Sequence, residues 1–422
     1  MTTTPAVDAC PRCAEPTVAL GLPHRWCPAC DWNLQVTPAV LGWGWVDRRL
    51  HRVATRLTDG QFTALADGPL VRRSASAARV VTLVAAALLL TAVVAIAGLG
   101  VWLLLMPGAL AKGLGVLLIG TAVVLRPRLG RLGHLTDDAH QIERSAAPEL
   151  FGLVERVATA VGAPVPHILL IGYERNAYTT TVGVRRQRVL CLGLPLWATL
   201  DPQERVALLG HELGHFVNGD VRRGPLTQVA ERTLGRIAGL FDPSTSGGGF
   251  IEALSRSIGW IISRTAMALQ LVLLWTSLRD SQRAEYLADE LGARAGGTAA
   301  ATGLADHLLL DEALDTVIAR EARAGNGLPA WRAAAVTARA NQAANIGPLR
   351  RLSRHSEASL FASHPPTGLR AEMLERRPAL PAAVTLDEAT STRIDGEVGK
   401  LAERVRRALA DGGLAPIRRR WR

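Results

Sequence analysis

The stretch "GHELGHFVNGD", residues 210–220, places His211 and His215 four residues apart and Glu212 directly after the first histidine. Side chains four residues apart on a helix project from the same face. Two imidazoles so placed can bind one Zn²⁺ at ~2.1 Å. Glu212 lies about 100° around the helix from His211, close enough to reach a water at the metal. The stretch therefore predicts a helix that carries a zinc site and a general base.

The ends of this helix are also encoded. Asp201 is a good N-cap, Pro202 suits the first helical position, and Glu204 completes a capping box. Gly219 is suited to end the helix. Chance would supply a pattern such as HExxH about 0.01 times in a chain of this composition, which makes the motif a specific signal.

A zinc site of this kind needs a third ligand. A metzincin would place a histidine six residues after the second one, but that position is Val221, so that class is excluded. The segment "RDSQRAEYLADELGA", residues 279–293, has Glu285 and Asp289 four residues apart on a helical pattern. Glu285 can serve as a ligand, and Asp289 can accept a hydrogen bond from one of the imidazoles.

Residues 1–45 contain a second metal pattern. Two CxxC pairs lie 13 residues apart, formed by Cys10, Cys13, Cys27 and Cys30. Four thiolates at this spacing predict a tetrahedral structural zinc in a small ribbon. A closed four-cysteine site leaves no open position for chemistry, so its expected role is structural.

Two apolar segments predict a membrane hairpin. Residues 80–106 have no charge, and residues 109–125 form a shorter apolar run after an "MPG" turn. Because a span needs ~20 apolar residues, residues 80–126 are predicted to be a transmembrane helical hairpin behind a polar linker, residues 46–79. Arginines flank both ends of the hairpin, and no signal peptide precedes it. The positive-inside rule then places the ribbon and the C-terminal part on the cytoplasmic side of the cell membrane, in a multi-pass protein.

Residues 140–422 are predicted to form one globular domain with a basic C-terminal tail. Short apolar or β-branched runs at residues 167–172, 177–183 and 188–194 predict a small sheet. Residues 202–310 and most of 330–410 have a helical pattern. The expected fold class is mainly α with a small β-sheet (α+β).

Four motifs in order resemble the HtpX-type membrane zinc metallopeptidases, relatives of the CAAX prenyl endopeptidases. They are "ERNAYTT" (174–180), "HELGHFVNGD" (211–220), "RAEYLAD" (283–289) and "SHPPTGLR" (363–370). The resemblance covers roughly residues 145–377 and implies a zinc peptidase domain of the gluzincin type. The ribbon lies outside the basic pattern of the family. One strong apolar run follows the HExxH motif here, where bacterial members tend to have two.

The resemblance implies a role for each matching residue. His211, His215 and Glu285 would bind the catalytic zinc, and Glu212 would be the general base. His364 would be a catalytic residue near the oxyanion. The remaining implied site residues are Asp289 and Arg370, supporting the zinc site, and Asn176 and Ala177, binding substrate at a strand edge.

Residues 258–278 pose a topological question, since they are long and apolar enough to cross a bilayer. Both motif histidines precede the segment and Glu285 follows it, so a single crossing would separate the ligands by ~30 Å of hydrocarbon. The other candidate span, residues 225–241, contains three charges and reads as amphipathic. We therefore predict no net crossing and a helix that continues toward Glu285.

The sequence thus predicts a membrane-bound zinc endopeptidase acting on protein or peptide substrates, with misfolded or membrane proteins as the substrates that the resemblance implies. The expected cofactors are one catalytic and one structural Zn²⁺. The net charge of +11 suits anionic lipid or nucleic acid, and the apolar segments favour lipid, with no nucleic acid expected. Two alternatives remain open: a catalytically inactive membrane scaffold, and a membrane-tethered nucleic-acid-binding protein.

Overall fold

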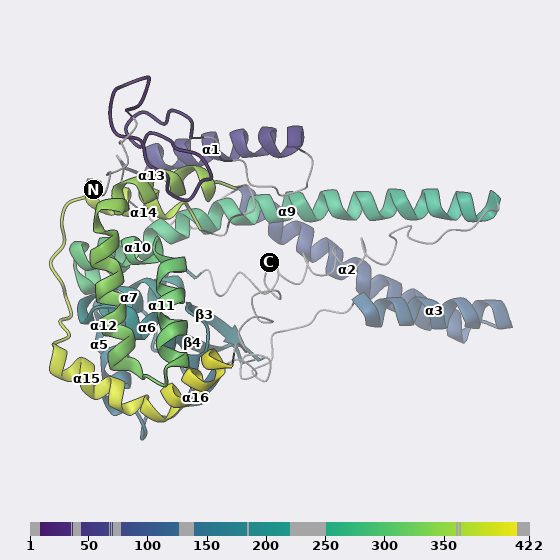
Figure 1. Ribbon diagram of the computed structural model, residues 1–422. Coiled ribbons are helices and arrows are strands. Elements are labelled where there is room, and N and C mark those ends of the chain that lie inside the picture. The colour runs from purple at the N-terminus through teal and green to yellow at the C-terminus, as the bar shows by residue number, and fades with distance from the viewer. Residues whose placement is uncertain are drawn as a thin grey trace. The chain divides into compact units, whose positions relative to one another are not determined.

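The computed structural model (Figure 1) describes residues 9–34, 36, 44–66, 68, 70, 77–125, 139–183, 185–219, 250–359, 362 and 364–411. The chain divides into two compact units. The larger unit comprises residues 1–72, 132–219 and 282–422, and the smaller one comprises residues 73–131 and 220–281. The described chain is mainly helical with one four-stranded sheet, as the α+β prediction requires.

The sheet of the larger unit has the order β1-β2-β4-β3. Its strands are β1 (Ala139–Ile142), β2 (Ile168–Gly172), β3 (Ala177–Val182) and β4 (Gln187–Gly193). β2 and β4 are parallel, and the two outer strands pair antiparallel with them. Three strands match the predicted runs within two residues, whereas β1 was not predicted. Cys191 is buried in the core on one face of the sheet.

Most of the rest of the larger unit is helical. Its helices include α1 (Gly44–Ala66), α5 (Pro148–Val161), α6 (Leu194–Thr199), α7 (Pro202–Asn218), α10 (Thr298–Leu308), α11 (Asp311–Arg323), α12 (Leu328–Gln342), α13 (Ile346–Ser356), α14 (Thr367–Arg376), α15 (Glu388–Glu397) and α16 (Gly399–Ala410), with a 3-10 turn at Ala343–Asn345. α7 is buried along nearly its whole length and contacts α5, α10 and β3. The HExxH helix is therefore a central element of the core.

Helix α1 lies largely within residues 46–79, the segment that the sequence predicts to be a polar linker. Gly44–Ala66 form a helix of 23 residues. Phe62 and Leu65 of this helix pack in one cluster with Tyr286, Leu369 and Met373. The many arginines of the segment make its apolar residues at helical spacing hard to recognise in the sequence. Burial of these apolar residues holds α1 against the rest of the larger unit.

Helix α9 (Phe250–Gly296) is 47 residues long and belongs to both units. It includes residues 258–278 and Glu285 without a break, so the predicted continuation of that segment toward Glu285 is confirmed. The absence of a net membrane crossing stays a prediction.

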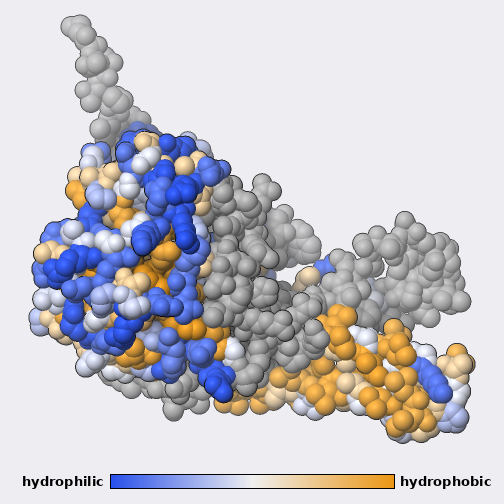
Figure 2. Space-filling model, turned by 90° about the horizontal axis from the view of Figure 1, so that it is seen from below, coloured by the Kyte–Doolittle hydropathy of each residue, from blue (hydrophilic) through white to orange (hydrophobic). Residues whose placement is uncertain are grey.

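The smaller unit contains a helical hairpin. α2 (Ala77–Leu105) and α3 (Ala109–Leu125) pack against each other on either side of the predicted turn. A Cβ on Gly115 would lie 2.7 Å from the carbonyl oxygen of Gly100. The two helices therefore come closest to each other where each has a glycine. The outer surface of this pair, at the right of Figure 2, is mostly apolar. Within the described residues, α2 is the one helix long and apolar enough to cross a membrane, and α3 is shorter.

Candidate metal centre

The HExxH helix α7 begins and ends as its sequence predicts. Asp201 and Glu204 form the capping box, with the Asp201 backbone N–H donating to Glu204 Oε2 at 3.0 Å. Gly219 ends the helix with φ of 74°, a left-handed conformation that favours glycine. Between these ends, the rings of His211 and His215 lie 5.0 Å apart between centroids and are perpendicular. The helix therefore holds both imidazoles one turn apart in a fixed register.

Small residues bring α9 against α7. A Cβ on Gly210 would lie 2.6 Å from Ala295 Cβ and 3.0 Å from Gly292 Cα. A Cβ on Gly214 would lie 3.2 Å from Ala288 Cα. The two helices thus approach at backbone distance along two turns, and this close approach sets how far the Glu285 carboxylate lies from the histidines.

We expect Gly210→Val to disturb the centre directly. The added side chain would overlap α9, and overpacking of a core costs typically about 1–3 kcal/mol. The variant should have a lower unfolding temperature by circular dichroism and reduced zinc content by elemental analysis. Gly152→Ala on α5 is the matched control, because its Cβ would meet only the Arg156 guanidinium at 3.8 Å. Full zinc content and an unchanged unfolding temperature in Gly210→Val would contradict this account of the helix pair.

The three predicted ligands lie together. His211 Nε2 is 3.6 Å from Glu285 Oε2, and His215 Nε2 is 3.6 Å from Glu285 Oε1. One ligand atom from each residue lies within 4.8 Å of the others. Two ligands at 2.1 Å from a tetrahedral metal are separated by about 3.4 Å, so the spacing fits a zinc ion. Two imidazoles and a carboxylate are also a donor set that zinc prefers.

The electrostatics of the centre favour an ionised carboxylate. Burial by itself would raise the pKa of Glu285, but the imidazoles of His364 and His215 outweigh it and hold that pKa well below its ordinary value. The side chain is 4% exposed. An ionised, buried carboxylate facing two imidazoles is a ready ligand for a divalent cation.

Asp289 contacts His211 on its Nδ1 side, and Arg370 holds Asp289 in place. His211 Nδ1 lies 3.0 Å from Asp289 Oδ1. Arg370 donates to both oxygens of the same carboxylate, at 2.6 and 2.9 Å. Burial would raise the pKa of Asp289, but Arg370 lowers it to about 2. The ionised Asp289 accepts a hydrogen bond from the Nδ1–H of His211, which leaves the Nε2 lone pair available to bind a metal.

His364 lies at the edge of the same cluster. Its Nδ1 is 2.6 Å from Glu285 Oε2, and its side chain is 59% exposed. The following segment is fixed by hydrogen bonds from the backbone N–H groups of Thr367 to Glu357 and of Gly368 to Ser353, both at 2.7 Å. The structure therefore places His364 beside the proposed third ligand and open to solvent.

Glu212 and the strand-edge residues lie on neighbouring elements. Glu212 is 6% exposed on α7, and its backbone oxygen accepts a hydrogen bond from Thr179 Oγ1 of β3 at 3.2 Å. Ala177 begins β3, an outer strand of the described sheet, and Asn176 directly precedes it. The Asn176 backbone oxygen accepts from the N–H of Gly193 at 2.7 Å.

Two features that hold this strand edge were not predicted. A Cβ on Gly193 would lie 2.2 Å from the Asn176 oxygen, so only glycine allows the approach. The side chain of Arg175 is 7% exposed and forms ion pairs with Asp311 and Asp315 of α11. The position of Arg175 beside Asn176 in the "ERNAYTT" motif was the available signal, but its partners lie about 140 residues away and have no local pattern.

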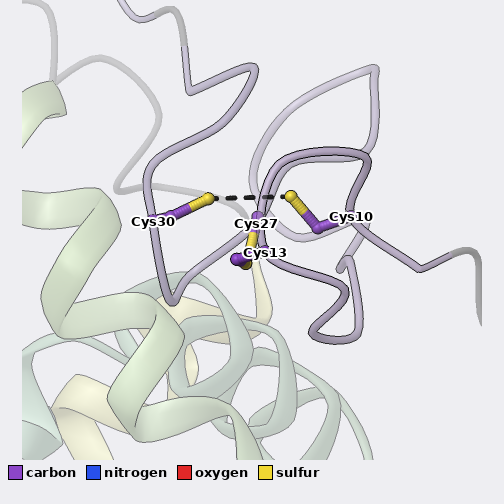
Figure 3. A group of neighbouring side chains, drawn as sticks. All are labelled: Cys10, Cys13, Cys27 and Cys30. Atoms are coloured by element: carbon purple, nitrogen blue, oxygen red, sulfur yellow. Dashed lines mark hydrogen bonds between the residues drawn. The ribbon is translucent and has the colours of Figure 1, made fainter.

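The four cysteines of the N-terminal ribbon also come together (Figure 3). Their ligand atoms all lie within 4.8 Å of one another, with sulfur–sulfur distances of 3.6 Å for Cys10–Cys30 and 3.5 Å for Cys13–Cys27. Four thiolates at 2.3 Å from a tetrahedral zinc are separated by about 3.8 Å. Each CxxC turn is followed by a left-handed residue, Ala14 with φ of 62° and Asp31 with φ of 56°. The two turns thus have matching backbones, and the donor set fits zinc.

Within the larger unit, the ribbon packs against α13. Arg351 Nε donates to Asp31 Oδ1 at 3.0 Å. A Cβ on Gly21 would lie 2.4 Å from the side chain of Leu352, so the two surfaces are in close contact. The ribbon is therefore seated on the helix that precedes the His364 segment.

Comparison with known proteins agrees with the geometry of the HExxH centre. Residues 145–378, more than half of the chain, match Peptidase family M48. Protease HtpX of Pseudomonas putida (strain W619) is 27% identical over 239 residues, which cover 54% of this chain and 71% of the relative. A Protease HtpX homolog of Thermococcus kodakarensis is 28% identical over 248 residues, covering 57% of this chain and 77% of the relative. No solved structure matches the chain significantly.

Proposed function

The chain belongs to peptidase family M48, and from that premise we propose how its own residues carry out the reaction. It is an HtpX-like membrane zinc metallopeptidase, a hydrolase of peptide bonds. His211, His215 and Glu285 bind the catalytic zinc. The observation that carries this assignment is that their ligand atoms lie within 4.8 Å of one another in a buried cluster.

The metal and the protein residues have separate tasks. When bound, zinc would act as a Lewis acid: it would polarise the scissile carbonyl and lower the pKa of the water bound to it. Glu212 accepts one proton from the attacking water while the water oxygen forms a bond to the carbonyl carbon. Glu212 then delivers that proton to the amine nitrogen when the C–N bond breaks. His364, exposed beside Glu285, donates a hydrogen bond to the developing oxyanion.

Substrate binding is assigned to the edge of β3. The strand pairs with β4 on one side, and on its other side no strand of the described chain pairs with it. An extended peptide can add to such an edge through backbone hydrogen bonds. We assign Asn176 and Ala177 to the start of this binding edge. Thr179 Oγ1 of this edge strand donates a hydrogen bond to the backbone oxygen of Glu212. The strand that would bind the peptide is therefore fixed to the helix that carries the base.

The membrane location is assigned to the α2–α3 hairpin. Its apolar outer surface supports a hairpin in the membrane, although only α2 has the length of a span and α3 is shorter. We assign the ribbon (residues 1–45) and the peptidase domain (residues 140–422) to the cytoplasmic side. Residues 258–278 add no net crossing. Misfolded or damaged membrane proteins are the proposed substrates, because the site is tethered to the bilayer and acts on extended chain.

Hydrolysis of casein by the purified full chain tests the proposed activity. We expect cleavage that 1,10-phenanthroline abolishes and added Zn²⁺ restores. A serine-protease inhibitor, which should have no effect, controls for contaminating peptidases. Chelator-resistant cleavage, or none from a preparation with full zinc, would overturn the proposal.

The ribbon zinc is assigned a structural role. Cys10→Ser combined with Cys13→Ser should lower the zinc content from two to one per chain, because two thiolates are too few for a closed tetrahedral site. Casein hydrolysis per remaining zinc should be largely retained. Cys191→Ser, which lies in the sheet core, is the matched control and should keep both zinc ions. A folded double variant that is inactive would contradict the structural role.

A further inference from the structure

Helix α1 has two faces of opposite character. Ala54, Phe62 and Leu65 are at most 5% exposed and face the larger unit. The opposite face is exposed and basic, with Arg48, Arg49, Arg52 and Arg56, together with Trp45. Trp45 is 68% exposed, which is unusual for so large an apolar side chain.

These five exposed residues form a stripe. At 100° per residue, they lie within an arc of about 100°, with Trp45 inside it. The acidic residues of α1 leave a net positive charge on the stripe. Asp47 is 4% exposed and lies on the opposite face, whereas Asp59 falls inside the arc and is 49% exposed, with Arg354 of α13 at 3.6 Å. The described face therefore carries a concentrated positive charge beside an exposed aromatic ring.

We propose that this face of α1 is a membrane-surface contact that binds the phosphate groups of anionic lipids, with Trp45 in the headgroup layer. This inference rests on the proposed membrane location. Guanidinium groups bind phosphate oxygens in bidentate geometry, and tryptophan is enriched at membrane–water interfaces. A basic helix face of this kind is typical of a helix that lies on a membrane surface.

Chain connectivity favours a lipid surface over nucleic acid. Ten residues separate the end of α1 at Ala66 from the apolar helix α2, which begins at Ala77. Even fully extended, this connection reaches only about 40 Å. A helix tethered so closely to a membrane span meets lipid phosphates at high local concentration. Because α1 also packs on Tyr286, next to Glu285, lipid binding would brace the helix that carries the third zinc ligand.

Fluorescence quenching in vesicles tests the proposal. The full chain is reconstituted in brominated phosphatidylcholine, alone or mixed with brominated phosphatidylglycerol. The difference between wild type and Trp45→Phe isolates the Trp45 signal from the other tryptophans. We expect stronger Trp45 quenching in the anionic vesicles and a loss of at least about half of that increase at high salt.

Charge variants identify the cause of the quenching. Replacing all four stripe arginines by Gln should abolish the anionic-lipid increase, and replacing them by Lys should retain most of it. The matched control replaces four exposed arginines elsewhere with Gln: Arg156, Arg294, Arg323 and Arg404. This control should quench like wild type.

Three results would overturn the proposal: no increase in Trp45 quenching with anionic lipid, an equal loss in the control, or a Trp45 response to polyuridylate but not to lipid. Retention of the chain in vesicles after a carbonate wash is measured in parallel. Loss of retention would contradict the membrane location itself, whereas retained chain without Trp45 quenching contradicts only the surface contact. Neither readout depends on peptidase activity.

Discussion

Glu212→Gln is expected to abolish casein hydrolysis while the chain keeps its full zinc content. Glutamine preserves the shape of the side chain but cannot accept the proton of the attacking water. Loss of a general base costs typically about 10²–10⁴ in rate, so hydrolysis should fall by at least about 10². The metal ligands His211, His215 and Glu285 are untouched, and elemental analysis should find unchanged zinc.

Glu204→Gln is the matched control on the same helix. Glu204 caps α7 and forms an ion pair with Arg339, so this change should lower stability and leave hydrolysis by the folded protein within a few-fold of wild type. Wild-type turnover in Glu212→Gln would remove Glu212 from the mechanism. Loss of zinc in that variant would instead make it a ligand.

Glu285→Ala is expected to lose both the catalytic zinc and the activity. It removes one of three ligand atoms and the buried negative charge that faces both imidazoles. Two histidines alone bind Zn²⁺ more weakly, so zinc content should fall to that of the ribbon after dialysis. The circular dichroism spectrum should stay helical, because α9 and α7 meet through glycine and alanine rather than through this side chain.

Glu290→Ala provides the control further along α9. Glu290 is 25% exposed and pairs with Arg377 at 3.2 Å, away from the three ligand atoms. This variant should retain both zinc ions and its activity. Full zinc stoichiometry in Glu285→Ala would show that another residue is the third ligand.

Local sequence patterns predicted the elements whose determinants lie close together in the chain. The helix α7 needed only the Asp201 cap, the Glu204 side chain and Gly219. The spacing of His211 and His215 is a property of one helical turn, and the ribbon depends on two CxxC turns. Strands β2, β3 and β4 could be predicted because each is a short apolar or β-branched run between glycine or polar residues.

The remaining features depend on long-range packing. β1 has four residues, which is too short for a periodic signal, and becomes a strand by pairing with β2. The arginines of α1 concealed its buried stripe, although Phe62 and Leu65 recur at helical spacing. The contact between Gly210 and Gly292 could not be predicted from the sequence of either helix alone. The grouping of Glu285 with the histidines was expected from motif order, but the small residues that enforce it were not.

The zinc ligand set measured by X-ray absorption tests the central claim most directly. In a variant with all four ribbon cysteines changed to Ser, only the zinc of the HExxH centre should remain. The spectrum should show nitrogen and oxygen ligands near 2.0–2.1 Å, two of them imidazoles, and no sulfur. That zinc should be lost when Glu285→Ala is added. A sulfur ligand, or an unchanged spectrum at full zinc occupancy after Glu285→Ala, would contradict the assignment of His211, His215 and Glu285.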